Sequence, residues 1–275
     1  MKKNIKKPMK ASVSAKESAA GQNGRRISLK KVSVTVALTV AILIFGSIAL
    51  FTTLLVMANT SEFRASRAEY DSYRELASDI ESNPDEYGGT YLSALDEEML
   101  QINPDYVCWI RIDGTGIDYP VVRGTDNNKY IYTSFNGEPN LAGTLFMDFR
   151  NEGDLLNSYV GEALPHILIY GHNLERGGMF SHLRRFLDER FMEENQIITL
   201  VVHGQTVEYR IFSARLTDIN DPAYFLNFSE QRAFSRFADR IDAPLHATQI
   251  ITLSTCTTGG SDSARLVVQG YRLLG

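Results

Sequence analysis

The feature that most constrains the fold is a long apolar segment near the N-terminus. Residues 32–58, VSVTVALTVAILIFGSIALFTTLLVMA, include 27 positions without a charged side chain. An α-helix rises about 1.5 Å per residue, so this segment makes a helix of roughly 40 Å, enough to cross a hydrocarbon layer of about 30 Å. We therefore predict a transmembrane helix at 32–58 and a globular domain built only from the residues that follow it.

The apolar segment has two other interpretations. A cleavable signal peptide usually has an apolar run of about 7 to 15 residues, which is shorter than this one. Val56-Met57-Ala58 nevertheless makes a passable small-residue cleavage site, so removal of the segment stays open. A buried core helix is disfavoured, because no polar face recurs at helical spacing.

Charge is distributed unevenly along the chain. Residues 1–31 carry ten Lys or Arg and one acid, whereas the remainder carries 18 basic and 32 acidic residues. The positive-inside rule then predicts a basic cytoplasmic tail at 1–31 and an extracellular domain from about residue 59 onward. A basic tail alone would suit nucleic acid, but the apolar segment behind it argues against that partner. No second apolar run follows, so we expect a single-pass protein of the cell membrane.

The residues after the apolar segment begin with a helical region at 59–103. Residues 61–82 have apolar side chains at helical spacing, with Ser61 as the expected N-cap, and 91–102 form a second short helix. Asn83-Pro84 and Gly88-Gly89 separate the two helices. We expect these helices to form an N-terminal cap on the body of the domain.

Residues 104–275 are dominated by short β-like runs with turn residues between them. The eight runs are 107–113, 117–122, 143–148, 166–171, 196–202, 206–216, 249–256 and 264–273. They predict a mainly β fold with helical additions, arranged as a closed or nearly closed eight-stranded barrel. Two helical insertions are expected, at 179–188 and at 227–241, where Ser229 is the N-cap and Phe234 and Phe237 share one face.

The chain has two cysteines, and their surroundings differ. Cys108 precedes Trp109 in an apolar run and is expected to be a small buried thiol. Cys256 is the last residue of a strand, immediately before a turn. Outside the cell, paired cysteines tend to form disulfides, and the sequence does not exclude a bond between these two. If Cys256 is unpaired, it is a candidate nucleophile.

The last two strands, taken as a hairpin, place an arginine beside this thiol. Pairing their apolar residues sets Cys256 opposite Arg265, with both side chains turned away from the core. A guanidinium there favours the thiolate and can donate hydrogen bonds to an oxyanion. A one-residue slip would separate the two residues, and Arg265 would then be a solvated edge charge.

Thiol chemistry on a carbonyl also needs a group that carries a proton to the leaving amine. His172 follows the strand 166–171 at a strand-to-loop exit like that of Cys256. The other histidines are expected in less suitable places: His182 and His246 at the surface, His203 in a turn and His166 at the start of an apolar strand. The sequence does not say whether the ends of the His172 and Cys256 strands meet.

Three elements together resemble a known family. TLSTC at 252–256, an arginine nine residues later and YGHN at 170–173 resemble the sortases, cysteine transpeptidases of Gram-positive cell surfaces. Residues 108–151 are similar to the early barrel of class B sortases in particular. The resemblance implies a sortase-type catalytic barrel at 104–275, the N-terminal helical cap, and a helix before the last two strands.

The resemblance also implies an activity and a set of site residues. Cys256 is the implied nucleophile, His172 the catalytic histidine and Arg265 the catalytic arginine. The implied reaction cleaves the C-terminal sorting motif of a surface protein or pilin after a Thr, through a thioacyl-enzyme. An amine then accepts the acyl group, from a lipid-linked peptidoglycan precursor or a pilin lysine. The resemblance further implies that the peptide-binding positions of class B sortases are filled here by Asn127, Ile131, Tyr170, Tyr224 and Ser254.

The sequence departs from the family in places. Thr257 follows the cysteine where several relatives carry an acid, so no carboxylate that orients His172 is evident, and Asp262 is one candidate. Asp221-Pro222 resembles the lid motif of class C sortases but lies elsewhere in the chain, and we interpret it as a turn. No cofactor is expected, and two cysteines so far apart do not make a zinc site.

Two alternatives to a transpeptidase remain. One is a thiol peptidase that passes the acyl group to water, and the other is a surface binding domain without catalysis. The sorting motif and the acceptor amine are not specified by the sequence.

Overall fold

The computed structural model describes residues 29–87, 90–153, 155–156, 165–174, 177–228, 230–257 and 263–273. It divides into two units, residues 1–55 and 56–275, which we describe separately. In the first unit the described residues are helical and belong to α1 (Leu29–Ser82), and their apolar side chains, such as Ile42 and Phe45, are exposed. Among the described residues, α1 is the one helix apolar and long enough to cross a membrane, a property that membrane anchors share with signal sequences.

In the second unit, α1 ends where the sequence predicts and a second helix follows. α1 stops at Ser82, the 3₁₀ turn η1 spans Pro84–Tyr87, and α2 spans Tyr91–Ile102, as expected. The prediction that a helix begins at Ser61 is wrong, because the residues before Ser61 are helical too and its hydroxyl donates to the carbonyl of Ala58 (2.7 Å). Thr90 caps α2, and its hydroxyl accepts from the amide of Ser93.

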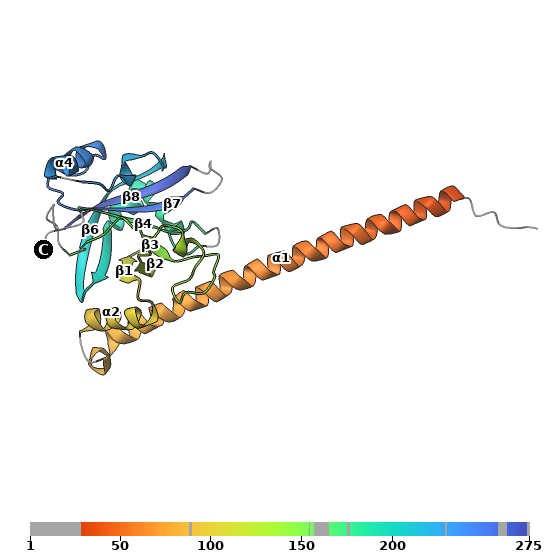
Figure 1. Cartoon of the computed structure of the whole chain (residues 1–275), viewed down its shortest axis with the longest axis horizontal. Helices are drawn as coiled ribbons and strands as arrows, with labels where there is room; N and C mark the ends of the chain where they lie inside the picture. The colour runs from red at the N-terminus through yellow and green to blue at the C-terminus, as the bar shows by residue number, and fades with distance from the viewer. Residues whose placement is uncertain are drawn as a thin grey trace, which may run out of the picture. The chain divides into compact units, whose positions relative to one another are not determined.

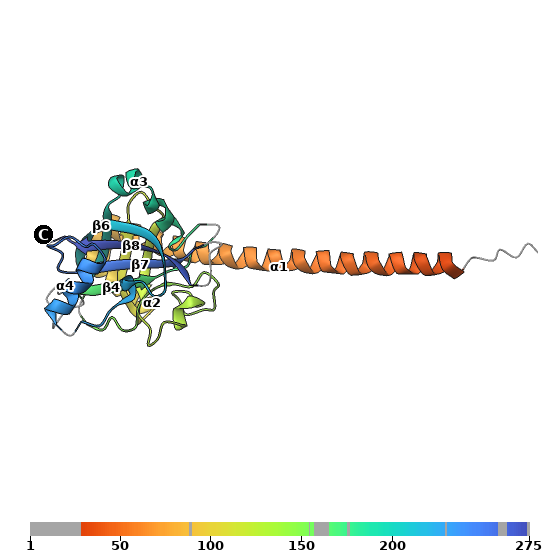
Figure 2. The same cartoon turned by 90° about the horizontal axis from the view of Figure 1, so that it is seen from above.

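Eight strands close into the predicted barrel. They are β1 (Tyr106–Ile112), β2 (Ile117–Val122), β3 (Leu145–Met147), β4 (His166–Tyr170), β5 (Ile197–Val202), β6 (Gln205–Asp218), β7 (Ile250–Cys256) and β8 (Ala264–Arg272). Their order around the barrel is β1-β2-β3-β4-β7-β8-β6-β5. Two neighbouring pairs are parallel, β2 with β3 and β4 with β7. Figure 2 shows β6, β8, β7 and β4 side by side on one side of the barrel.

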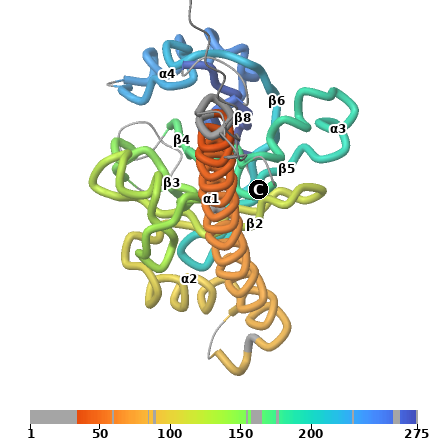
Figure 3. The backbone as a smooth tube through the Cα atoms, turned by 90° about the vertical axis from the view of Figure 1, so that its right-hand side faces the viewer, coloured from red at the N-terminus to blue at the C-terminus, as the bar shows by residue number. Residues whose placement is uncertain are grey.

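The two N-terminal helices close one end of the barrel, as a cap. Buried side chains of the last turns of α1 and of α2 join the core of the barrel; they are Tyr70, Tyr73, Ala77, Ile80, Ala94, Leu95 and Met99. Asp96 ties α2 to β1 and to the β5–β6 turn, because its carboxylate accepts from the Tyr106 hydroxyl and from the Gly204 amide (2.7 Å each). In Figures 1 and 3, α2 and the inserted helix α4 (Gln231–Arg240) lie at opposite ends of the barrel.

The helical insertions agree with the sequence in position but differ in detail. The segment predicted at 179–188 is the 3₁₀ helix η3 (Ser181–Leu187), and α3 (Glu189–Glu194) follows it. α3 was not predicted from the sequence; it starts at this point because the Asp188 carboxylate accepts from the Phe191 amide. Within α4, Phe234 and Phe237 are buried in a second small core, as expected, while Ser229 lies outside the described residues.

Candidate active site

The strands that carry His172 and Cys256 are neighbours in the barrel. β4 and β7 run parallel, with Tyr170 paired to Ser254, and the Gly171 amide donates to the Ser254 carbonyl (3.1 Å). Just beyond the strands, the Asn173 side chain donates to the carbonyl of Cys256 (3.0 Å). Parallel strands end at the same edge of a sheet. His172 and Cys256 therefore leave the barrel side by side, which answers the question that the sequence left open.

The pairing of Cys256 with Arg265 is confirmed. In the antiparallel pair β7–β8, Cys256 lies directly opposite Arg265, and on the other side of β8 Thr217 of β6 lies opposite Arg265. Cys256 is an exposed free thiol, whereas Cys108 is a free thiol buried inside the barrel. One Arg265 nitrogen donates to the carbonyl of Ala264 (2.9 Å). Cys256 and Arg265 thus occupy facing register positions at one end of the sheet.

His172 is oriented by a backbone carbonyl. Its Nε2 lies 2.7 Å from the carbonyl oxygen of Ile131, at the end of the 3₁₀ turn η2 (Lys129–Ile131), and its ring stacks on Tyr132 (centroids 5.8 Å apart). A carbonyl oxygen can only accept, so Nε2 carries hydrogen and Nδ1 is the atom that can gain or lose a proton. No described carboxylate contacts His172, and Asp262 lies outside the described residues.

Tyr224, Tyr170 and Ser254 lie together beside the end of β7. The Tyr224 hydroxyl and the Ser254 hydroxyl are 2.8 Å apart, and the Tyr224 ring stacks on Tyr170 with an angle of 8° between the rings. Burial raises the pKa of Tyr224, while the Ser254 hydrogen bond and the charge of Arg265 act in the opposite direction. Tyr224 therefore lies within electrostatic reach of Arg265, on the side of β7 that faces away from the core residue Leu253.

A buried carboxylate that the sequence analysis missed organises the adjoining wall. Asp148 has no exposed side-chain surface, and its two oxygens accept from Arg150 in a bidentate pair (2.8 Å each). The same carboxylate accepts from the Tyr170 hydroxyl and from the Asn127 amide (3.0 Å each). These contacts outweigh the cost of burial and lower the pKa of Asp148. The one signal in the sequence is an acid at the end of the 143–148 run.

The structure links the site residues inferred from the sequence into two groups. Cys256, Arg265, Ser254, Tyr224 and Tyr170 are joined by register, hydrogen bonds and ring stacking around the ends of β4, β7 and β8. Asn127 belongs to this first group, because the Asp148 carboxylate accepts from both Asn127 and Tyr170. The second group is His172 with Ile131, whose backbone carbonyl accepts from the His172 ring.

The structure also shows where the other four histidines lie. His166 is buried, with its two ring nitrogens 2.8 Å from the Phe225 carbonyl and from the Thr252 hydroxyl. His203 lies in the β5–β6 turn, and His246 is exposed, as predicted. The expectation for His182 was wrong, because it is half-buried and its Nδ1 accepts from the Gly116 amide. Among the described residues, no group of His, Cys, Asp or Glu is arranged to hold a metal ion.

Asp221-Pro222 is part of a turn, as the sequence suggests. The Asp221 side chain caps the 3₁₀ turn η4 (Pro222–Tyr224) by accepting from the Ala223 amide. It also forms an ion pair with Arg215 (2.6 Å), which lowers the pKa of Asp221 against the effect of its burial. This turn positions Tyr224, the last residue of η4.

The barrel is closed and eight-stranded, and Cys256, His172 and Arg265 lie at the ends of three of its strands. The family model described as the sortase domain matches residues 110–273, which is more than half of the chain. The chain belongs to the sortase family, the cysteine transpeptidases.

The relatives narrow this to one class. Over 244 residues the chain is 29% identical to sortase B of Staphylococcus aureus, covering 86% of this chain and 93% of that protein. It is 30% identical to sortase B of Listeria monocytogenes over 63% of this chain and 72% of that protein. Among solved structures, the sortase B–substrate complex of S. aureus matches with a TM-score of 0.66 and 27% identity, covering 77% of this chain and 98% of that one. Both sequence and structure therefore place the chain in class B.

Proposed function

We propose that Cys256, His172 and Arg265 are the catalytic residues of a membrane-anchored transpeptidase that cleaves a C-terminal sorting motif after a Thr. The observation that carries this proposal is the parallel pairing of β4 with β7, which brings His172 to the end of the strand that ends in Cys256. The register of Cys256 with Arg265 adds the guanidinium at the same place.

The first half of the reaction makes a thioacyl-enzyme. The Cys256 thiolate attacks the carbonyl carbon of the Thr, and the carbonyl oxygen becomes an oxyanion that accepts hydrogen bonds from Arg265. The C–N bond then breaks, and His172 as imidazolium gives the Nδ1 proton to the departing amine. Ile131 keeps the ring in position throughout, because its carbonyl holds the Nε2–H.

The second half reverses these roles. An amine of a lipid-linked peptidoglycan precursor or of a pilin attacks the thioester, and His172 Nδ1 takes up a proton from that amine. Cys256 leaves as a thiolate and a new amide bond is formed. The enzyme returns to its starting protonation state, so the cycle needs no cofactor.

The sorting peptide is proposed to bind along the wall that leads to Cys256. Tyr224 and Tyr170 form a stacked pair beside the thiol, and Ser254 lies under Tyr224. Asn127 and Ile131 continue this wall, and Asp148 fixes the side chains of Asn127 and Tyr170. A rigid aromatic and polar surface of this kind suits an extended peptide with apolar and amide side chains.

The proposal includes a location. Residues 32–58 would anchor the protein in the cell membrane, the basic residues 1–31 would stay in the cytoplasm, and the cap (59–103) and barrel (104–275) would lie outside the cell. Substrate proteins that carry a sorting motif and the lipid-linked acceptor would then meet the enzyme at the same membrane surface.

The activity is tested by product analysis with the full chain in detergent micelles. A library of short peptides with a fixed Thr is incubated with and without triglycine as the added amine. We expect cleavage after Thr and, with triglycine, a ligated product, both lost in Cys256→Ala. Cleavage without ligation would instead identify a thiol peptidase, and turnover that persists in Cys256→Ala would refute thiol catalysis at this residue.

A further inference from the structure

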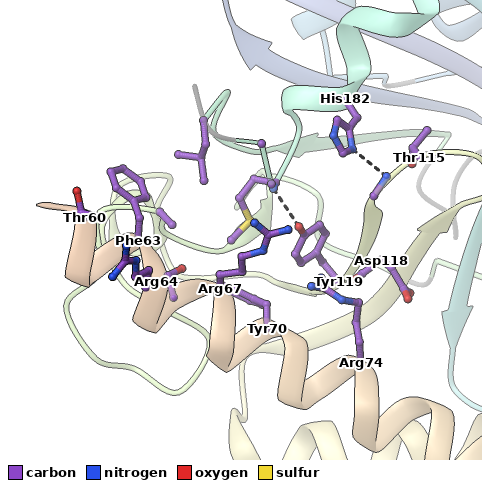
Figure 4. A pocket seen from close by; sticks show the side chains of 17 residues that line it. Thr60, Phe63, Arg64, Arg67, Tyr70, Arg74, Thr115, Asp118, Tyr119 and His182 are labelled. Carbon is purple, nitrogen blue, oxygen red and sulfur yellow. Dashed lines mark hydrogen bonds between the residues drawn. The ribbon is translucent and has the colours of Figure 1, made fainter.

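A cavity among the described residues has neither Cys256 nor Arg265 in its lining. Its volume is about 600 Å³, and it lies between the part of α1 that belongs to the second unit, the β1–β2 turn, and a third set of residues made up of Leu174, Gly177, Gly178, Met179 and His182. In Figure 4, Thr60, Arg64, Arg67 and Arg74 of α1 lie on one side, while Tyr119 and His182 lie across from them. The sorting-peptide wall proposed above does not include this cavity.

The cavity carries an excess of positive charge. Arg64 and Arg67 are exposed residues of its lining, and neither forms an ion pair or hydrogen bond with a described residue. The other charged lining residues are already neutralised. Arg74 pairs with Asp71, and the carboxylate of Asp118 accepts from Arg111 (3.2 Å). Two arginines are thus left to bind an anion.

A neutral hydrogen-bond donor lies on the opposite wall. His182 Nδ1 accepts from the Gly116 amide (2.8 Å), so its Nε2 carries the hydrogen. Burial and the nearby charge of Arg185 lower the pKa of His182, which keeps the ring neutral at pH 7. Two guanidinium groups that face an N–H donor form a set of hydrogen-bond donors suited to phosphate oxygens.

Part of the remaining lining is apolar, and the helical residues that line the cavity follow the proposed membrane anchor closely in the sequence. Phe63, Leu174 and Met179 contribute apolar side chains to the cavity. Arg64 lies six residues after Ala58, the end of the apolar segment, which is a helical rise of about 9 Å. Lipid headgroups extend roughly 5–8 Å beyond the hydrocarbon on each side. Arg67 lies nine residues after Ala58, a rise of about 14 Å, so the backbone at both arginines lies just beyond the headgroups. Helical side chains tilt toward the helix N-terminus, and the long arginine side chains therefore extend back toward the lipid phosphates.

We propose that this cavity binds the phosphodiester headgroup of an anionic membrane lipid. Arg64 and Arg67 bind the phosphate oxygens, His182 donates from the far wall, and the apolar side chains contact the glycerol and the start of the acyl chains. The proposal rests on the membrane anchoring of the proposed function, but it is independent of the chemistry at Cys256. It makes the helical cap a lipid-binding element as well as a cover for the barrel.

The test uses the full chain in dodecyl maltoside micelles. Trp109 is the single tryptophan, and its indole donates to Asp118 in the cavity wall (2.6 Å), so its fluorescence reports on occupancy. The chain is titrated with short-chain phosphatidylglycerol, with phosphatidylcholine of the same chain length, and with inorganic phosphate. We expect a saturable change with phosphatidylglycerol, and a Kd weakened about tenfold or more in the double variant Arg64→Gln/Arg67→Gln.

A matched control removes two arginines from another exposed helix face. Arg232→Gln/Arg236→Gln on α4 makes the same change in net charge and should leave the Kd within twofold, with thermal unfolding showing that both double variants are folded. Equal binding of phosphatidylcholine or of inorganic phosphate, or an unchanged Kd in the Arg64/Arg67 variant, would overturn the proposal. Repeating the titration with Cys256→Ala separates it from catalysis, because lipid binding should persist there.

Discussion

The proposed role of Arg265 depends on the register of the β7–β8 pair, because that register places Arg265 opposite Cys256. Removing one donor from an oxyanion site costs about 10²–10³ in kcat. We therefore predict that Arg265→Gln lowers kcat of peptide ligation by at least about 10². Arg265→Lys should recover only part of the rate, because an ammonium lacks the planar fork of the guanidinium. Initial rates with a fluorescent library peptide measure both variants.

The control for Arg265 is an arginine with no proposed role. Arg232→Gln removes a positive charge from the exposed face of α4 and should leave kcat within twofold. An Arg265→Gln variant that keeps more than a third of the wild-type kcat would contradict its assignment as an oxyanion donor.

His166 gives a second prediction at this scale, about stability. Burial lowers its pKa to about 4, against about 6.5 in the unfolded chain. The unfolded state then binds the proton more readily, so the stabilisation is complete above pH 6.5 and is lost as pH falls toward 4. We predict that the free energy of unfolding drops by about 2 kcal/mol from this group between pH 7 and pH 4.5.

Urea unfolding of the wild type and of His166→Gln at both pH values measures this effect. The variant has no imidazole to protonate, so its free energy of unfolding should depend less on pH in this window. Equal pH dependence of the two proteins would show that His166 titrates normally in the folded state.

At the scale of elements, local patterns explain what the sequence could predict. The eight strands are short apolar runs between turn residues, and matching the apolar faces of β7 and β8 set the pairing of Cys256 with Arg265. The parallel contact of β4 with β7 could not be predicted this way, because periodicity does not say which distant strands are neighbours. The family resemblance, rather than any local pattern, connected His172 to Cys256.

Other features left weaker signals or none. The acceptor for His172 is the backbone carbonyl of Ile131, which every residue possesses, so no side-chain motif could reveal it. Asp148 looks like an ordinary acid at a strand end, and its importance comes from three partners brought together by folding. The catalytic and peptide-binding roles stay predictions, whereas the geometry around them is now described.

Gly171 lies between Tyr170 and His172, where the chain leaves β4, and a side chain at this position can be tested. A Cβ on Gly171 would overlap Leu145 and lie 2.8 Å from the ring of Phe180. We predict that Gly171→Ala destabilises the fold by about 1–3 kcal/mol and also lowers kcat, since the strand end must shift. Gly46→Ala, where a Cβ meets nothing within 4 Å, is the control. Unchanged stability and rate in Gly171→Ala would show that the exit tolerates a side chain.

At the scale of the whole molecule, the proposal requires that the apolar segment stays attached. The 27 uncharged residues exceed the apolar run of a usual signal peptide, and a basic stretch precedes them. We predict that the protein, when expressed in Gram-positive cells, is found in the membrane fraction with residues 1–58 intact. Mass analysis of N-terminal peptides measures this, and a mature chain that starts after Ala58 would replace the anchor with a signal peptide.

The two thiols lie in different parts of the molecule, one in the core and one at the surface. Cys108 is buried in β1, where burial raises the pKa of its thiol, while Cys256 is exposed at the end of β7. Only an unpaired Cys256 can form the thioester on which the proposed reaction depends. An acyl group from a cleaved peptide should therefore be found on one cysteine and not on the other.

Capture of the acyl-enzyme tests this most directly. The full chain is mixed with the Thr-containing peptide library without an amine, quenched in acid, digested and mapped by mass spectrometry. We predict an acyl mass on Cys256 that ends at Thr, that disappears when triglycine is added before the quench, and that is absent in His172→Ala at short times. A disulfide between Cys108 and Cys256 in the active protein, or an acyl group on any other residue, would contradict it.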